Sequence, residues 1–244
     1  MTLYEKVKQK YDKPKPILFN TKMVRAILDG RKTQTRRPVK DQVDKDGMWG
    51  YAISTPKNSI SFRRKGKEWY YKLPYQPEDI LYVRETFAVG EVDYGEEPDG
   101  RAVPYISQCE GENNIIPKEW AIRNDIGIEE VRWKPSIHMP KKLARIFLKV
   151  TDISVERVQE ITPLDASKEG VDSILLDSDH PLYHKVYELY GKWDEEEQTM
   201  YAGNVDVFAT VWNEIYKEKG YGWEENPWVW VIEFERIERD DINE

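Results

Sequence analysis

The sequence predicts an α+β fold in which a mixed β-barrel is combined with a few short helices and with inserted hairpins and loops. Three stretches carry this prediction. Residues 21–28 place apolar side chains at three- and four-residue spacings, as one face of a helix does. Residues 144–161 largely alternate in polarity with a period of two, which indicates a strand. Residues 228–237 begin with apolar side chains on both faces, which is typical of a deeply buried strand.

The helix at 21–28 has signals at both ends. Asn20 or Thr21 can accept hydrogen bonds from the first turn, and Gly30 favours the left-handed exit by which many helices end. The apolar residues between them form one stripe, made of Met23, Val24, Ile27 and Leu28.

A basic, hydroxylated turn follows this helix at residues 31–37. In an extended conformation Thr33 and Thr35 point to one side of the chain. The opposite side carries Lys32, Gln34 and Arg36. The turn therefore predicts two faces with different chemistry.

The middle of the chain contains shorter strand signals. Residues 49–62 and 69–73 alternate loosely, with turn residues at 64–67, and predict an inserted hairpin. Residues 80–85 predict a short central strand. Residues 87–132 have little periodicity and predict an insertion with short strands.

A loop bracketed by prolines lies at residues 133–140 and predicts rigid positions for Lys134 and His138. Further on, Thr162 predicts the cap of a short helix that Gly170 ends.

The last third of the chain is acidic and aromatic. Residues 177–204 favour one helix from 181 to 193 followed by a loop. Asp206 predicts the cap of a firmer helix that ends at Gly220 and whose apolar face consists of Phe208, Val211, Trp212 and Ile215.

These elements predict one elaborated domain at 17–237, between an N-terminal arm at 1–16 and a C-terminal tail at 238–244. We expect its insertions at about 41–76, at about 87–132 and, acidic and helical, at about 177–220.

The net charge of −8 is divided unequally. Residues 1–149 contain 29 Lys and Arg against 21 Asp and Glu, whereas residues 150–244 contain 8 against 24. Residues 17–40 oppose seven basic residues with Asp29 alone, and residues 131–149 contain six basic residues and no acid. If the fold brings these two stretches together, they form a local positive surface on an acidic protein.

Location, membranes and metals are constrained by further features. Cys109 is the single cysteine, no signal-peptide core follows Met1, and no apolar run approaches about 20 residues, so we expect a cytoplasmic protein with no membrane partner. His180 and His184 are spaced as a helical pair, but Pro181 interrupts the start of that helix. A glycine-rich phosphate loop is absent. We therefore expect no metal site and no cofactor.

Residues 28–36 begin with a leucine, continue with Asp-Gly and Arg-Lys-Thr, and end with a second Thr and an Arg. This run resembles the entry motif of the ASCH domain family. The resemblance continues at 78–85, 161–171 and 228–234 and covers about half of the chain. It implies a PUA-like β-barrel. Long versions that end, like residues 226–230, in Asn-Pro-Trp-Val-Trp look like phage and prophage proteins.

The resemblance also implies a candidate catalytic set. Family members that look like amidohydrolases of N4-acetylcytidine use a Lys, a Thr and a Glu, which match Lys32, Thr35 and Glu169. A desolvated Lys can lose its proton near neutral pH and activate a hydroxyl or a water. In the alternative interpretation, Lys32 and Glu169 form an ion pair that fixes the helix against the barrel, and Thr35 is a strand residue.

Basic side chains outside this set predict contacts to phosphates or to a bound ligand. They are Arg31, Arg36, Arg37, Arg84, Lys134, His138, Lys141 and Lys142, with Lys40 and Arg145 as further candidates. Trp49, Trp69 or Trp133 can stack on a base. The leading expectation is an ASCH-type protein that binds RNA, DNA or a modified nucleoside. The alternatives are the amidohydrolase and a phage assembly protein that binds a protein partner through its acidic C-terminal half.

Overall fold

The structure is a computed structural model that describes residues 14–40, 42, 50–54, 59–64, 67–96, 102–107, 115–128, 131–177, 182, 184–186 and 199–238. Its strands form a mixed five-stranded sheet, in the order β1-β6-β11-β14-β2, and four small sheets. The α+β prediction is confirmed. Among the described residues the pairing does not close into the predicted barrel, because β1 and β2 are the two edges of an open sheet.

The chain divides into two compact units, each built from separate segments. Unit 1 consists of Met1–Gly30, Asp79–Lys149 and Arg236–Glu244, and unit 2 of Arg31–Glu78 and Val150–Glu235. The elements of unit 1 are β1 (Lys15–Leu18), α2 (Thr21–Leu28), β6 (Ile80–Arg84), β7 (Phe87–Val89), β8 (Glu91–Glu96), β9 (Ala102–Ser107), β10 (Ile115–Pro117) and α3 (Lys118–Arg123). Two 3-10 turns follow, at Ser136–His138 and Lys141–Leu143.

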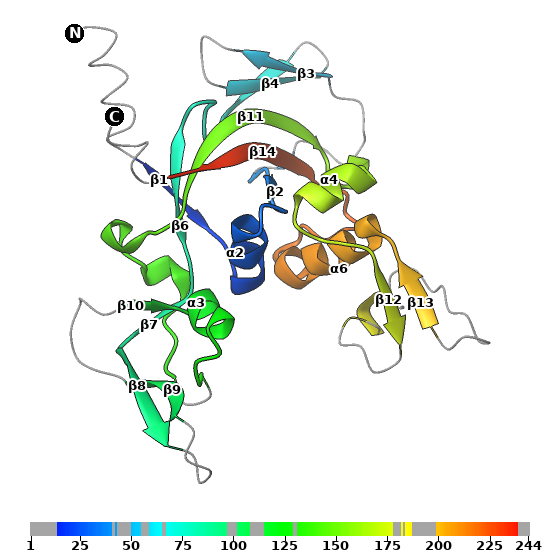
Figure 1. Ribbon diagram of the computed structural model, residues 1–244. Coiled ribbons are helices and arrows are strands. Elements are labelled where there is room, and N and C mark those ends of the chain that lie inside the picture. Colours follow the sequence, from blue (N-terminus) through cyan, green and yellow to red (C-terminus); the bar gives the residue numbers. More distant parts are fainter. Residues whose placement is uncertain are drawn as a thin grey trace, which may run out of the picture. The chain divides into compact units, whose positions relative to one another are not determined.

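Unit 2 contains most of the two long strands, β11 (Phe147–Arg157) and β14 (Trp228–Ile237), which are neighbours in the five-stranded sheet (Figure 1). Its other elements are β2 (Gln34–Pro38), β3 (Gly50–Ser54), β4 (Ser59–Arg64), β5 (Lys67–Lys72), α4 (Pro163–Lys168), β12 (Ile174–Asp177), β13 (Thr199–Ala202) and α6 (Asn204–Tyr216), with 3-10 turns at Val158–Glu160 and Lys217–Lys219.

The termini of α2 form as the sequence predicts. The Asn20 side chain accepts a hydrogen bond from the Met23 amide at 2.9 Å, and Gly30 has a φ of +74°. Val24, Ala26 and Ile27 are buried, so the apolar stripe faces protein. The strand before it starts earlier than expected, since β1 includes Lys15 and Pro16, which the sequence assigned to the arm.

The central strand of unit 1 is β6, as predicted. It pairs with β1 in parallel and with the first residues of β11 in antiparallel fashion. The insertion at 87–132 has the expected short strands, in the pairs β8–β9 and β10–β7, and one helix, α3, that the sequence did not predict.

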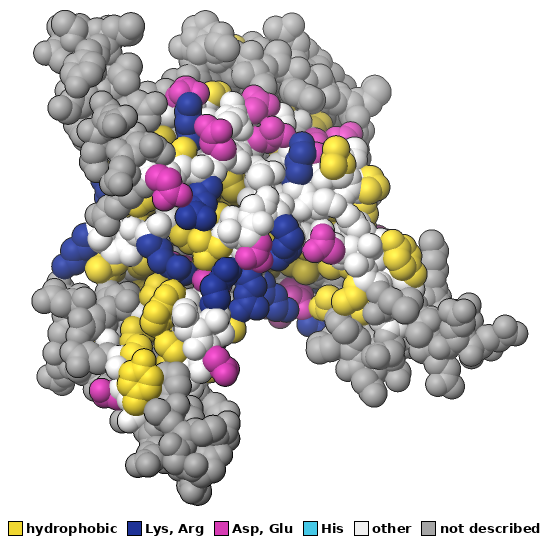
Figure 2. Space-filling view, viewed as in Figure 1, with side chains coloured by type: hydrophobic (Ala, Val, Ile, Leu, Met, Phe, Trp, Pro, Cys, Tyr) yellow, Lys and Arg dark blue, Asp and Glu magenta, His cyan; other side chains and the backbone are white. Residues whose placement is uncertain are grey.

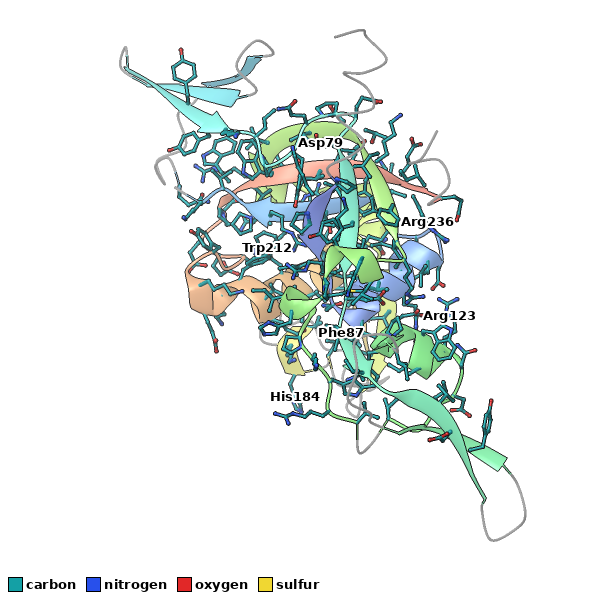
Figure 3. All side chains as sticks on the ribbon, turned by 90° about the vertical axis from the view of Figure 1, so that its left-hand side faces the viewer. Asp79, Phe87, Arg123, His184, Trp212 and Arg236 are labelled. Atoms are coloured by element: carbon teal, nitrogen blue, oxygen red, sulfur yellow. The ribbon has the colours of Figure 1, made fainter. Side chains whose placement is uncertain are left out.

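The core of unit 2 lies between β14 and two helices, α4 and α6 (Figure 1). Trp212 of α6 (Figure 3) and Ala166 of α4 belong to the same buried cluster as Val229 and Val231 of β14. The terminal strand β14 lies inside the five-stranded sheet, between β11 and β2, in agreement with the deeply buried strand that the sequence predicts at 228–237.

Two predictions for unit 2 change in detail. The helix α6 begins at Asn204 because Gly203 is its N-cap; Asp206 lies within the first turn and accepts a hydrogen bond from the Gly203 amide at 2.9 Å. The predicted hairpin at 49–73 is an antiparallel three-stranded sheet, β3-β4-β5. Most of the helix expected at 181–193 lies outside the described residues.

Candidate functional site

Lys32 occupies the centre of a buried polar cluster in unit 2. Its ammonium donates to Glu169 Oε2 at 2.7 Å, to the Glu169 carbonyl at 2.9 Å and to the Gln34 carbonyl at 2.9 Å. The side chain of Lys32 is 0% exposed and that of Glu169 is 5% exposed. Three acceptors match the three N–H groups of a charged lysine, so the geometry fits the ion-paired form.

Arg36 extends this cluster along the same face of β2. Its Nη1 donates to Glu169 Oε1 at 3.2 Å and to Gln34 Oε1 at 2.7 Å, and its Nε donates to Glu156 Oε1 at 2.7 Å. Gln34 in turn donates to Glu233 Oε1 at 2.8 Å. The predicted side on which Lys32, Gln34 and Arg36 lie together is therefore the side that faces these carboxylates.

Local structure fixes the position of Glu169. Thr162 caps α4, and Glu169 is the C-cap of that helix, followed by Gly170 with a φ of +85°. Backbone hydrogen bonds then attach Thr33 to α4 and to β14. The Thr33 amide donates to the Lys168 carbonyl at 2.9 Å, and the Phe234 amide donates to the Thr33 carbonyl at 2.9 Å. The Glu169 carboxylate is thus held beside the residue that enters β2.

The buried charges balance. Lys32 and Arg36 oppose Glu169 and Glu156, and burying charges without such partners costs several kcal/mol per ion. Burial lowers the pKa of Lys32, against the opposing effect of the Glu169 carboxylate. Burial likewise raises the pKa of Glu156, although the Arg36 guanidinium acts in the opposite direction.

The structure brings two of the three candidate catalytic residues together. Lys32 and Glu169 are in contact, whereas Thr35 lies between Gln34 and Arg36 in the strand and so projects from the opposite face. Thr35 is 1% exposed and pairs with Ile232 of β14. The ion pair of the alternative interpretation is present in the structure, and Thr35 is a strand residue, as that interpretation expected.

Three predicted phosphate contacts of unit 2 have partners within the protein. Arg31 is exposed and donates to the Gly170 carbonyl at 3.1 Å, and Arg37 donates to the Tyr216 hydroxyl at 3.0 Å. Arg36 is 2% exposed. Its guanidinium therefore does not lie on the surface, where the predicted contact to a phosphate would need it.

In unit 1, the loop at 131–143 carries four of the predicted contacts, Lys134, His138, Lys141 and Lys142. Arg84 donates from Nε to the Met139 carbonyl at 2.8 Å and from Nη2 to the Ile137 carbonyl. It therefore holds the loop in place from β6. The loop is also attached to β7, because the amide of Lys134 donates to the Phe87 carbonyl at 2.7 Å. Its exposed basic residues are Arg132, Lys134, His138, Lys141 and Lys142.

A second buried charge cluster in unit 1 was not predicted. Arg145 donates to both oxygens of Glu85, at 2.8 and 2.9 Å, and to Glu119 Oε2 at 3.1 Å. Arg123 of α3 (Figure 3) donates to Glu119 Oε1 at 2.9 Å. Glu85 and Glu119 are each 1% exposed. From the sequence, Arg145 was predicted only as a phosphate contact, since its partners lie 26 and 60 residues away.

The side chains of four further candidates are not described by the structure. Cys109, His180 and the side chains of Trp49 and Trp69 lie outside what the structure describes. Within the described residues, no group of His, Cys, Asp and Glu side chains is arranged to hold a metal ion. No helix in the described part of the chain is long and apolar enough to span a membrane.

The surface has both signs of charge. Figure 2 shows Lys and Arg side chains on the same face as Asp and Glu side chains, although the net charge is −8.

In the comparisons with known proteins, no family model, curated protein or solved structure matched the chain.

Proposed function

We propose that this protein binds a nucleic acid through the basic loop of unit 1, residues 131–143. One observation carries the proposal: Arg132, Lys134, Lys141 and Lys142 are exposed on a segment that contains no carboxylate. Phosphate contacts supply much of the affinity of nucleic-acid-binding proteins, and exposed Lys and Arg make them.

The attachment of the loop supports this proposal. Two hydrogen bonds from Arg84 and the bridge between Lys134 and Phe87 fix the backbone on both sides of the 3-10 turn Ser136–His138. A loop held in this way loses little conformational entropy when it binds. Its cations are therefore already positioned for a strand of phosphates.

The ASCH-like motifs extend the proposal to a family and a finer fold. The resemblance at residues 28–36 and 161–171 implies an RNA- or nucleoside-binding protein of phage or prophage type with a PUA-like barrel. This part of the proposal rests on the mixed sheet that the described residues form.

The test measures binding of short single-stranded RNA and DNA by fluorescence anisotropy over a range of salt concentrations. Lys134→Gln, Lys141→Gln and Lys142→Gln in one triple variant should weaken binding. If all three lysines contact phosphates, the slope of log affinity against log salt should fall by about 2, because each contact to a single strand contributes about 0.7.

A matched control removes three exposed lysines elsewhere, with Lys22→Gln, Lys217→Gln and Lys219→Gln. Both triple variants lower the net charge equally, so only a local surface separates them. Equal slopes in the two variants would refute the loop as the binding surface. No binding of either nucleic acid by the wild-type protein would refute the function.

The amidohydrolase remains the second candidate because of one observation, the desolvated Lys32 beside Glu169. Its chemistry would need N4-acetylcytidine to reach a side chain that is 0% exposed. The test is release of acetate from N4-acetylcytidine by the wild-type protein and by Lys32→Met. Turnover by the wild type that Lys32→Met abolishes at a temperature where circular dichroism shows the variant to be folded would favour this candidate; no turnover by the wild type would end it.

A further inference from the structure

The basic loop of unit 1 contains an aromatic ring, that of Trp133, and a lysine covers a face of this ring. Lys118 Nζ lies 5.4 Å from the centroid of the Trp133 ring. Trp133 is half-buried and packs against the cluster of Ile116, Ala121 and Ile126. The ring is thus supported by the core of unit 1 and also contacts a cation from α3.

The backbone of β7 sets this arrangement. Phe87 (Figure 3) pairs with Pro117 of β10 on one side and with Lys134 on the other. The amide of Lys118 also donates to the Thr86 carbonyl at 2.9 Å. The residues next to these pairs are Lys118 and Trp133, so the segments that contain them are both attached to residues 86–87.

Lys118 and Arg157 make similar contacts with tryptophans, but they are held differently. In unit 2, Arg157 Cζ lies 4.4 Å from the Trp228 centroid, Arg157 also donates to the Asn226 carbonyl at 3.0 Å, and Trp228 is 6% exposed. Lys118 has no ion pair among the described residues, and its long side chain can move off the ring at the cost of one cation–π contact.

We infer that Trp133 is a stacking platform for one base of a single-stranded nucleic acid, and that Lys118 moves from the ring to a phosphate when the base binds. Every base has a π-face, so a tryptophan within a basic loop selects single strands without reading sequence. The bases of a duplex are stacked on one another and cannot use such a platform. This inference rests on the proposed function, since the loop supplies the other phosphate contacts.

The test compares a strand of about ten deoxythymidines, within the site sizes known for such proteins, with an abasic strand of equal length and charge. The wild type should bind the thymidine strand at least about tenfold more tightly, within the range that stacking of one base supplies. Trp133→Leu should bring the two affinities close together without changing the salt slope. Lys118→Met should keep the preference and lower the slope by about 0.7.

Trp120→Leu is the matched control, because Trp120 is 38% exposed on the same helix as Lys118. It should keep the preference. Three results would overturn the inference while leaving the proposed function intact. They are equal affinity of the wild type for both strands, an unchanged preference in Trp133→Leu, and tighter binding of the duplex that the thymidine strand forms with its complement. Failure of both strands, and of the single-stranded RNA, to bind would refute the proposed function itself.

A photo-crosslink provides a readout that does not depend on the folding of Trp133→Leu. A strand carrying 5-iodouracil should crosslink to the peptide that contains Trp133 in the wild-type protein. A crosslink confined to another tryptophan, such as Trp120, would also overturn the inference.

Discussion

Replacing Lys32 with alanine should destabilise unit 2 strongly. The change removes three hydrogen bonds and leaves Glu169, whose side chain is 5% exposed, without its closest cation. Removing one partner of a buried ion pair costs about 3–5 kcal/mol. Arg36 still contacts Glu169 at 3.2 Å, so we expect a loss near the lower end, about 3 kcal/mol.

Thermal unfolding followed by circular dichroism measures this loss. In a chain of this size a change of 1 kcal/mol shifts Tm by about 2–4 °C, so Lys32→Ala should lower Tm by about 6–12 °C. Lys185→Ala is the control, since Lys185 forms an ion pair with Glu214 on the surface and such pairs contribute little.

The double variant Lys32→Met with Glu169→Leu separates a structural pair from two independent residues. It removes both charges at once, so its loss of stability should be clearly smaller than the sum of the two single losses. An unchanged Tm in Lys32→Ala, or strictly additive losses in the double variant, would refute a structural role for this pair.

Two further predictions concern the loop of unit 1 and helix α4. Arg84→Met should loosen residues 135–143, so that trypsin cleaves faster after Lys141 and Lys142. Nucleic-acid affinity should fall roughly three- to tenfold, while the slope of log affinity against log salt stays unchanged because the lysines remain. A lower slope would contradict this role of Arg84. At Asp165, burial acts to raise the pKa, but the Thr162 hydrogen bond and the charges of Arg36 and Lys168 outweigh it and hold the pKa below its usual value. The stability that this carboxylate contributes is therefore present above about pH 3.9 and is lost as the pH falls through the lowered pKa, so Asp165→Asn should flatten the dependence of Tm on pH in acid.

The predictions that the structure confirms depend on local signals. The Asn20 cap and the positive φ of Gly30 follow from the chemistry of those residues, and the burial of the first half of β14 follows from apolar side chains on both faces. Such signals act within a few residues and can be read directly from the chain.

The features that the sequence did not predict depend on distant residues. Nothing within the run 174–177 shows that it pairs with 199–202, and α3 is only six residues long, with no side-chain cap. The barrel was predicted from the pattern of strands and from the resemblance, whereas strand order is decided by pairing across the chain. The partners of Arg145 could not be predicted for the same reason, since Glu85 lies 60 residues before it.

The alternation of Lys32, Gln34 and Arg36 shows where sequence reasoning stops. The spacing correctly placed the three side chains on one face of the strand, but it could not tell whether that face meets solvent or protein. The answer depends on Glu169 and Glu156, which lie 137 and 120 residues away from the cations that they bind. Two cations can be buried here because the buried Glu169 and the half-buried Glu156 pair with them. A Lys and a Glu at matching motif positions are therefore expected for a structural pair as well as for a catalytic one, and the unfolding experiment on Lys32 and Glu169 separates the two.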